Sequence, residues 1–220
     1  MDKFKLLEAC VPNVSRETFE RLLVYERLLF EKNKEVNLVG RGTLGDLWSR
    51  HFLDAAQLFS SISDPSKSLL DIGSGAGFPG MVLSILGYSN VTLVDSTKKK
   101  CDFLEFVSRE TNATASVRWA RVEDMGERYE VLTARAVADL RVMLGYAFQL
   151  MKPSGTAFFL KGRRVQEEIK EAQKKWVFTC ELKQSITHTD GHICQIKNIY
   201  KKLNVNSKAD VVRKVLQGEI

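Results

Sequence analysis

The period of hydrophobic positions along the chain changes near residue 65. Before this point, apolar residues recur every three or four positions, which indicates amphipathic helices. Ser15 is a suitable N-cap for a helix that extends through residues 20–36. The side chains expected on the buried face of this helix are Phe19, Leu22, Leu23, Tyr25, Leu29 and Phe30. A second helix is expected from Asp46, with Leu47, Phe52, Leu53, Ala56 and Phe59 facing inward.

From residue 68 onward, short β-rich runs alternate with amphipathic segments. The expected strands are residues 68–72, 91–95, 115–119, 130–134 and 156–161. The expected helices are residues 79–86, 98–110, 139–151 and 165–176. This alternation is typical of βαβ crossovers, so it predicts an α/β fold with a mostly parallel sheet that is covered on both faces.

The last two apolar runs of the chain predict a hairpin. Residues 177–186 and 192–200 are joined by the short turn THTDG. We therefore expect a seven-stranded sheet that ends with an antiparallel strand inserted at its edge. The expected divisions of the chain are an N-terminal helical segment at 1–64, a main domain at 65–200 and a basic C-terminal tail at 201–220.

Composition narrows the class of protein. A hydrophobic content of 44% and a charged content of 27% are ordinary for a globular protein. No apolar run approaches the ~20 residues needed to span a bilayer, and the first residues lack a secretory signal, so we expect a cytoplasmic protein without a membrane partner. The four cysteines lie far apart and the three histidines have no ligand spacing, so reduced thiols and no metal site are expected. The net charge of +6 suits a polyanion such as nucleic acid, but it also suits a merely basic surface.

The stretch LLDIGSGAGFPG, residues 69–80, concentrates backbone freedom between a strand and a helix. Gly73, Gly75 and Gly77 can adopt positive φ at little steric cost, and they let a ligand approach the backbone without a Cβ in the way. The helix that follows adds free N–H groups at its start. A strand, a glycine-rich turn and a helix in this order indicate the nucleotide-binding edge of a doubly wound sheet.

Two acids beside this turn favour one cofactor over another. Asp95 ends the next strand, where a carboxylate can accept hydrogen bonds from ribose hydroxyls. Both NAD and S-adenosylmethionine carry such a ribose. Asp71 is awkward beside a pyrophosphate but suits the methionine ammonium group, and the terminal hairpin suits a methyltransferase sheet. We therefore favour a methyltransferase over an NAD-dependent oxidoreductase, which is kept as an alternative.

Two further residues follow strands at the same edge. Glu123 follows the third strand, where its carboxylate or the adjacent backbone can read the amine edge of adenine. Arg135 emerges at the carboxyl end of the fourth strand, where ligands bind in open α/β sheets. A solvated loop acid and an exposed surface arginine are the alternatives for these two positions.

Several blocks together carry a resemblance to a known family. They are NLVG (37–40), RHFLDA (50–55), LLDIGSGAGFPG (69–80), VDSTKKKCDFLEFVSRE (94–110), RVED (121–124), TARAVADL (133–140) and FFLKG (158–162). In order and spacing the chain resembles the bacterial 16S ribosomal RNA guanine-N7 methyltransferases, also called the glucose-inhibited division protein B family. The resemblance covers nearly all of the chain, but the tail from Lys201 to Ile220 does not match.

The resemblance implies a Rossmann-like class I enzyme that transfers a methyl group from S-adenosylmethionine to N7 of one guanine in 16S ribosomal RNA. It implies a 16S ribosomal RNA or small-subunit substrate, and the chain shows no sign of an obligate protein partner. By the same likeness, the residues that contact the cofactor are Gly73, Phe78, Val122, Glu123 and Arg135. A non-catalytic RNA-binding protein with the same fold stays as a third alternative.

The chemistry of guanine N7 agrees with what the sequence lacks. N7 offers a lone pair and carries no proton, so in-line displacement of the methyl group needs positioning and exclusion of water rather than a general base. The chain has no Asn/Asp-Pro-Pro motif for exocyclic amines and no Pro-Cys nucleophile for pyrimidine C5. Lys161 keeps a ribose 2′-hydroxyl methyltransferase open as an alternative, because that reaction uses a lysine base.

The remaining basic residues are assigned to RNA. No catalytic residue is certain, and positioning is expected from Arg135 and Lys161. Lys161, Arg163 and Arg164 follow a strand on the ligand side and are expected at RNA phosphates or at guanine O6. The opposite wall is expected from Arg50 and His51. A target base in folded RNA is then read by shape and by unstacking.

Overall fold

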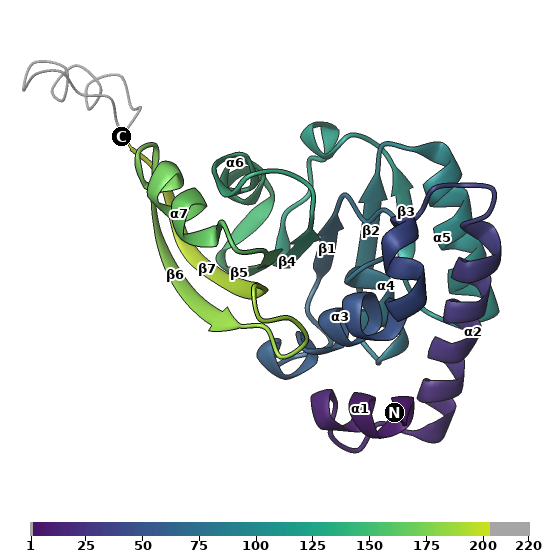
Figure 1. Ribbon diagram of the computed structural model, residues 1–220. Coiled ribbons are helices and arrows are strands. Elements are labelled where there is room, and N and C mark those ends of the chain that lie inside the picture. The colour runs from purple at the N-terminus through teal and green to yellow at the C-terminus, as the bar shows by residue number, and fades with distance from the viewer. Residues whose placement is uncertain (1, 203–220) are drawn as a thin grey trace, which may run out of the picture.

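A computed structural model describes residues 2–202, so the tail expected at 201–220 lies outside the described residues beyond Lys202. Within them the chain forms one seven-stranded sheet with the order β3-β2-β1-β4-β5-β7-β6 (Figure 1). The strands are β1 (Leu69–Ile72), β2 (Val91–Asp95), β3 (Ser116–Trp119), β4 (Tyr129–Arg135), β5 (Met151–Lys161), β6 (Trp176–Gln184) and β7 (His192–Lys201). The first five pair in parallel, and β7 is inserted antiparallel between β5 and β6, which confirms the expected sheet.

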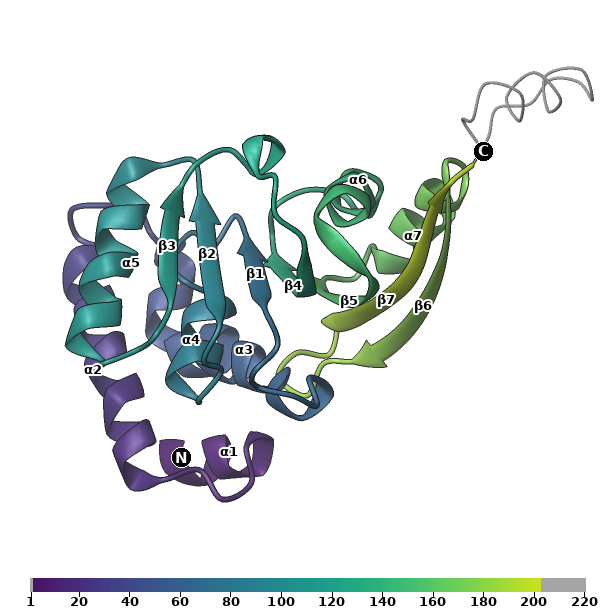
Figure 2. The same ribbon diagram turned by 180° about the vertical axis from the view of Figure 1, so that it is seen from behind.

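The helices lie in two layers. They are α1 (Lys3–Cys10), α2 (Arg16–Lys32), α3 (Asp54–Ala56), α4 (Gly80–Ile85), α5 (Lys98–Glu110), α6 (Leu140–Leu150) and α7 (Val165–Gln173). Figures 1 and 2 show α6 and α7 on one side of the sheet and the N-terminal helices with α4 and α5 on the other. Leu69 packs in the cluster with α1–α5, whereas its neighbour Leu70 packs in the cluster with α6 and α7. Successive strand residues thus bury their side chains on opposite faces, as a sheet covered on both sides requires.

The parallel register brings three strand ends to one edge. Asp71 of β1 lies beside Leu93 of β2 on one side and beside Thr133 of β4 on the other. The carboxyl ends of β2 and β4 therefore flank the turn that follows β1. This edge is where an open α/β sheet binds its ligands.

The long N-terminal helix is shorter than expected. Ser15 caps α2 by accepting a hydrogen bond from the Thr18 N–H at 3.0 Å, but the helix ends at Lys32 rather than near residue 36. Asn33 ends it, because its side chain accepts hydrogen bonds from the backbone N–H groups of residues 38 and 39. Phe30, expected to be buried, is 49% exposed, since it lies on the face of α2 that turns away from the sheet.

The helix expected from Asp46 is wrong as a single α-helix. The chain forms a 3₁₀ turn at Arg41–Asp46, a π-helical turn at Trp48–Leu53, the short α3 and a further 3₁₀ turn at Phe59–Ser61. Four residues of the π turn are buried, namely Trp48, His51, Phe52 and Leu53. A π turn of this kind is uncommon and often accompanies a functional site.

The C-terminal third corrects two element ends. Helix α7 ends at Gln173 rather than at residue 176, because Trp176 begins β6 and donates its indole N–H to the Arg141 carbonyl at 3.2 Å. Strand β5 begins at Met151, five residues earlier than the expected 156. Among residues 2–202, no helix is long and apolar enough to cross a membrane.

Candidate functional site

The glycine-rich turn after β1 has the backbone that the sequence predicts. Gly73, Gly75 and Gly77 adopt φ values of 63°, 58° and 104°, all in the left-handed region. A Cβ at Gly77 would lie 2.5 Å from the Tyr25 hydroxyl, so close packing excludes a side chain there. A Cβ at Gly75 would meet nothing nearer than 3.8 Å, so the turn presents bare backbone to open space. The turn is therefore fixed by close packing at Gly77, while its backbone at Gly75 is accessible to a ligand.

Asp95 joins the end of β2 to this turn. One carboxylate oxygen accepts a hydrogen bond from the Gly75 N–H at 2.9 Å, and the other accepts one from the Thr97 N–H at 2.8 Å. The carboxylate thus lies directly beside the open backbone of the turn. An acceptor beside bare backbone fits the ribose and the adjoining chain of S-adenosylmethionine.

Asp71 supports the turn from beneath. Its side chain is fully buried, and it accepts a hydrogen bond from the Thr133 hydroxyl at 2.7 Å. Burial raises the pKa of this carboxyl from 3.8 to about 6. Gly80 is packed against it, since a Cβ at Gly80 would lie 2.6 Å from the Asp71 Cβ. The structure thus places Asp71 under the turn, out of direct reach of the methionine ammonium group for which the sequence suggested it.

The turn after β3 offers an acceptor at the next position along the edge. Val122 and Glu123 lie in a 3₁₀ turn at Val122–Asp124, and Glu123 is exposed. Its carboxylate accepts a hydrogen bond from the Tyr146 hydroxyl at 2.8 Å. A hydrogen bond from its own backbone and the one from Tyr146 lower the pKa of Glu123. An ionised carboxylate here suits the amine edge of adenine.

Phe78 lies below the edge rather than on it. Its ring is buried and stacks on Tyr25 at 5.4 Å and on His51 at 5.1 Å between ring centroids. The guanidinium of Arg135 lies 5.0 Å above the same ring. The ring therefore forms a floor for the Arg135 guanidinium, and the buried Phe78 side chain offers no exposed surface to a ligand.

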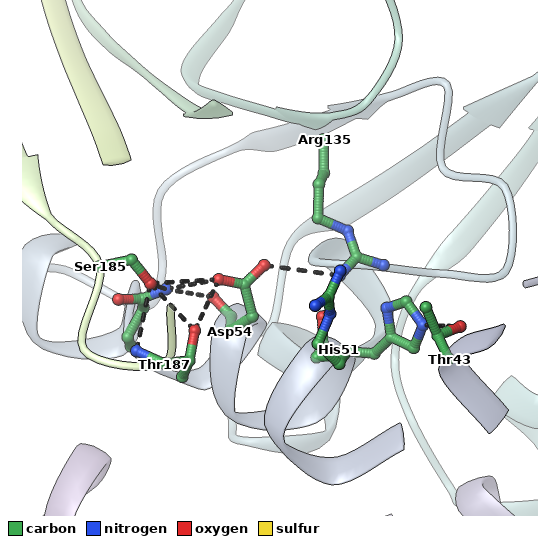
Figure 3. A network of polar contacts seen from close by, with 8 residues as sticks. Thr43, His51, Asp54, Arg135, Ser185 and Thr187 are labelled. Carbon is green, nitrogen blue, oxygen red and sulfur yellow. Dashed lines mark hydrogen bonds and ion pairs between the residues drawn. The ribbon is translucent and has the colours of Figure 1, made fainter. Parts of the chain in front are cut away.

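Arg135 is the last residue of β4 and lies at the same edge of the sheet as the glycine turn. Its Nη1 donates to the Arg50 carbonyl at 2.8 Å and lies 3.5 Å from Asp54 Oδ2 (Figure 3). Its side chain is 18% exposed. Burial lowers the pKa of the guanidinium, and the negative charge of Asp54 opposes that change. The residue is thus charged, largely desolvated and held by the N-terminal segment.

A cavity of about 790 Å³ opens beside Arg135. It is lined by Ser49, Arg50, His51, Asp54, residues 135–139, residues 160–164, Glu168, Thr187, His188 and residues 190–192. The glycine turn does not belong to this lining. Cavities of roughly 300–1,000 Å³ hold small ligands, so this one has room for a nucleotide. The exposed residues of its lining include the cations Arg50, Arg163 and Arg164 and the carboxylates Asp139 and Asp190.

Two residues expected to contact RNA, His51 on the opposite wall and Lys161 at a phosphate or at guanine O6, are engaged within the protein. His51 is buried, and burial with the nearby Arg135 lowers its pKa to about 3, so the ring is neutral near pH 7. Lys161 is 10% exposed, and its ammonium group donates to the Ala138 carbonyl at 2.6 Å and to Glu168 at 2.7 Å. Both residues line the cavity, but neither presents a free cation, because the His51 ring is neutral and the Lys161 ammonium group is paired. The local sequence does not reveal which side chains the fold buries.

Sequence reasoning missed a polar network centred on Asp54. Its partners are Gln57 on the same segment and Ser185 and Thr187 in the turn between β6 and β7. Asp54 lies within the RHFLDA block, which could have singled it out. Nothing in the sequence indicates its partners 131 and 133 positions away. Across the described residues, no group of three or more His, Cys, Asp or Glu side chains could hold a metal ion.

Comparison with known proteins places this geometry in a family. The family described as rRNA small subunit methyltransferase G matches residues 18–198. A ribosomal RNA small subunit methyltransferase G of Paramagnetospirillum magneticum is 42% identical over 187 residues, which cover 84% of this chain and 91% of the relative. The protein of the same name from Rickettsia prowazekii is 37% identical over 188 residues, which cover 86% of this chain and 98% of the relative.

Solved structures show the same fold at low identity. A ribosomal protein L11 methylase from Lactobacillus delbrueckii subsp. bulgaricus is similar with a TM-score of 0.57 at 12% identity, over 68% of this chain and 78% of that one. A TehB-like SAM-dependent methyltransferase from Corynebacterium glutamicum gives a TM-score of 0.51 at 14% identity, over 68% and 88% of the two chains. These similarities confirm the Rossmann-like methyltransferase fold.

Proposed function

Because the chain belongs to the rRNA small subunit methyltransferase G family, we propose that it methylates N7 of one guanine in 16S ribosomal RNA. The family makes the protein an S-adenosylmethionine-dependent methyltransferase of small-subunit ribosomal RNA. An NAD-dependent oxidoreductase and a non-catalytic RNA-binding protein, the alternatives open from the sequence, are not activities of this family. To this family assignment the proposal adds guanine as the base and N7 as the atom that receives the methyl group.

One observation carries the proposal: the glycine turn and the cavity both adjoin the end of β4. Ile72, which precedes the turn, pairs with Ala134, and residues 135–139 line the cavity. At the turn, bare backbone at Gly75 and the carboxylate of Asp95 fit the cofactor. The cavity of about 790 Å³ fits a nucleotide, so a cofactor and a base would meet near Arg135.

The cofactor is assigned to two turns and one carboxylate. We assign the turn at Gly73–Gly77 and the Asp95 carboxylate to the ribose and methionine parts, and the turn at Val122–Glu123 to adenine. When bound, S-adenosylmethionine supplies an electrophilic methyl group on its sulfonium. These residues bind the cofactor and orient its methyl group, and none of them transfers a proton in the reaction.

The residues of the cavity support guanine N7 as the atom that accepts the methyl group. N7 has a lone pair and no proton, so the chain needs to hold the base in line and exclude water, which are positioning tasks. Lys161, the base that a ribose 2′-hydroxyl reaction would use, is paired with Glu168 at 2.7 Å. That engagement favours N7 over the ribose hydroxyl. The transfer also brings positive charge onto the guanine, so a paired lysine opposes it less than a free one.

The rim residues Arg50, Arg163 and Arg164 are assigned to RNA phosphates. They are exposed and line the cavity, and phosphate contacts of this kind supply much of the affinity for RNA and make it salt-dependent. A 16S ribosomal RNA or small-subunit substrate would place the protein in the cytoplasm.

The test is transfer of a labelled methyl group to unmodified 16S ribosomal RNA and to small subunits, followed by mass spectrometry of the nucleosides. We expect a single 7-methylguanosine. A 2′-O-methylated nucleoside would instead select the alternative reaction and return Lys161 to the role of base. Absence of transfer to both substrates, with cofactor binding intact, would refute the RNA assignment.

A further inference from the structure

Asp54 uses its two carboxylate oxygens in different ways (Figure 3). Oδ1 accepts hydrogen bonds from Gln57 Nε2 at 2.8 Å and from Thr187 Oγ1 at 3.0 Å, and Ser185 Oγ lies at 3.5 Å. Oδ2 lies 3.5 Å from Nη1 of Arg135. One oxygen is thus held by several donors, while the other is directed at the guanidinium.

The donors to Oδ1 form a rigid clamp. Gln57 Nε2 also donates to Ser185 Oγ at 3.1 Å, and its Oε1 accepts from the Ile186 N–H at 3.1 Å. Gln57 and Ser185 are both buried. The turn between β6 and β7 is therefore fixed to the N-terminal segment by side chains that have little freedom. Several donors on one oxygen fix the plane of the Asp54 carboxylate.

Arg135 depends on this arrangement for its own orientation. Its guanidinium lies over the flat Phe78 ring. This ring limits how closely the guanidinium can approach it, but it does not limit rotation of the guanidinium parallel to the ring plane. The Arg50 carbonyl at 2.8 Å gives one directional contact, and Asp54 Oδ2 gives the second. Both acceptors contact Nη1, so together they limit the rotation that the Phe78 ring leaves free.

We propose that Asp54 is a positioning residue for methyl transfer, which orients Arg135 and is itself oriented by Ser185 and Thr187. The proposal rests on the proposed function, because it takes Arg135 to act where the cofactor and the base meet. Asp54 acts through Arg135 and does not touch the substrate. The turn between β6 and β7, far from the cofactor residues in sequence, thereby controls the geometry of the site.

The experiment is a double-mutant cycle on methyl transfer to small subunits. Asp54→Asn keeps the size of the side chain but removes its charge, and Arg135→Gln removes the guanidinium. We expect Asp54→Asn to lower kcat/KM by about a hundred-fold, the loss that a displacement of about 1 Å can cause in a positioned reaction. In the Arg135→Gln background, Asp54→Asn should cause no further loss, because its effect passes through Arg135.

A second pair of variants tests the clamp. Thr187→Val removes one donor to Asp54 and should lower kcat/KM less than Asp54→Asn does, again with no effect in the Arg135→Gln background. Thr189→Val is the matched control, since this exposed threonine of the same turn is not among the donors to the Asp54 carboxylate, which are Gln57, Ser185 and Thr187. Thermal unfolding of each variant identifies losses that are due to instability alone. If Asp54→Asn does not fold, the Thr187→Val and Arg135→Gln cycle carries the test.

Two results would overturn the inference. Wild-type kcat/KM in Asp54→Asn would show that Arg135 needs no such orientation. Losses that multiply in the double variant would show that Asp54 acts independently of Arg135. Failure of the proposed function is a different result, because wild-type protein would then transfer no methyl group to ribosomal RNA.

Discussion

Replacing Asp71 by Asn should stabilise the protein by an amount that grows with pH. Asp71 is fully buried, and burial raises the pKa of its carboxyl from 3.8 to about 6 against an opposing hydrogen bond from Thr133. At 1.36 kcal/mol per pKa unit, that rise corresponds to a cost of about 3 kcal/mol for the ionised group in the folded protein.

The sign of the pH dependence follows from the direction of the pKa change. Below about pH 3.8 the carboxyl is protonated in both the folded and the unfolded chain, so it has no effect on the free energy of unfolding. Between about pH 4 and 6 the folded chain binds the proton more tightly. Stability is therefore lost as the pH rises through this range, and the whole cost of about 3 kcal/mol is present above about pH 7.

The assay is urea unfolding of wild type and Asp71→Asn at several pH values from 4 to 8. The difference in unfolding free energy should be about 0.5 kcal/mol at pH 4 and reach about 3 kcal/mol in favour of Asn at pH 7.5. Thr133→Val should change stability in the opposite direction at pH 7.5, because it removes a hydrogen bond that favours the carboxylate. Asp102→Asn, at an exposed position on α5, is the surface control. A difference between wild type and Asp71→Asn that stays constant across this pH range would refute the reasoning.

Two further predictions concern the turn and the rim of the cavity. Gly77→Ala should destabilise the protein by roughly 2 kcal/mol or more in thermal unfolding, because φ is +104° and the new Cβ would lie 2.5 Å from the Tyr25 hydroxyl; an unchanged melting temperature would contradict this packing. Arg163→Ala with Arg164→Ala should raise the KM for RNA, leave the KM for the cofactor unchanged, and reduce the slope of log affinity against log salt by about two. Lys174→Ala, which removes an exposed cation beyond the end of α7, is its control, and an equal effect there would show that only net charge matters.

Much of the fold follows from local pattern. Strand β2 at Val91–Asp95 and helix α5 at Lys98–Glu110 have the bounds that the sequence predicts, because alternation and helical periodicity are properties of neighbouring residues. The glycine turn is likewise predictable, since Gly73, Gly75 and Gly77 fill positions where positive φ excludes most other residues. The proximity of the glycine turn to Asp95 is also predictable from the sequence, because adjacent parallel strands end at one edge of the sheet.

Other parts needed the tertiary structure. The helix expected from Asp46 divides into a π turn, the short α3 and a 3₁₀ turn, and four residues of the π turn are buried, namely Trp48, His51, Phe52 and Leu53. Trp176 leaves its expected helix for β6, where its ring packs under α6. Tertiary packing overrides local propensity in both places.

The sequence by itself determined the class of fold, the glycine turn with its acid, and the blocks that carry the resemblance, since all of these are written in short stretches of chain. Only the tertiary structure decided which charges are available. Lys161 and His51 look like RNA contacts in the sequence, but the fold pairs one with Glu168 and buries the other as a neutral ring. It also brings Thr187 to Asp54 across 133 positions. Burial and long-range pairing depend on how the whole chain packs, and no local pattern records them.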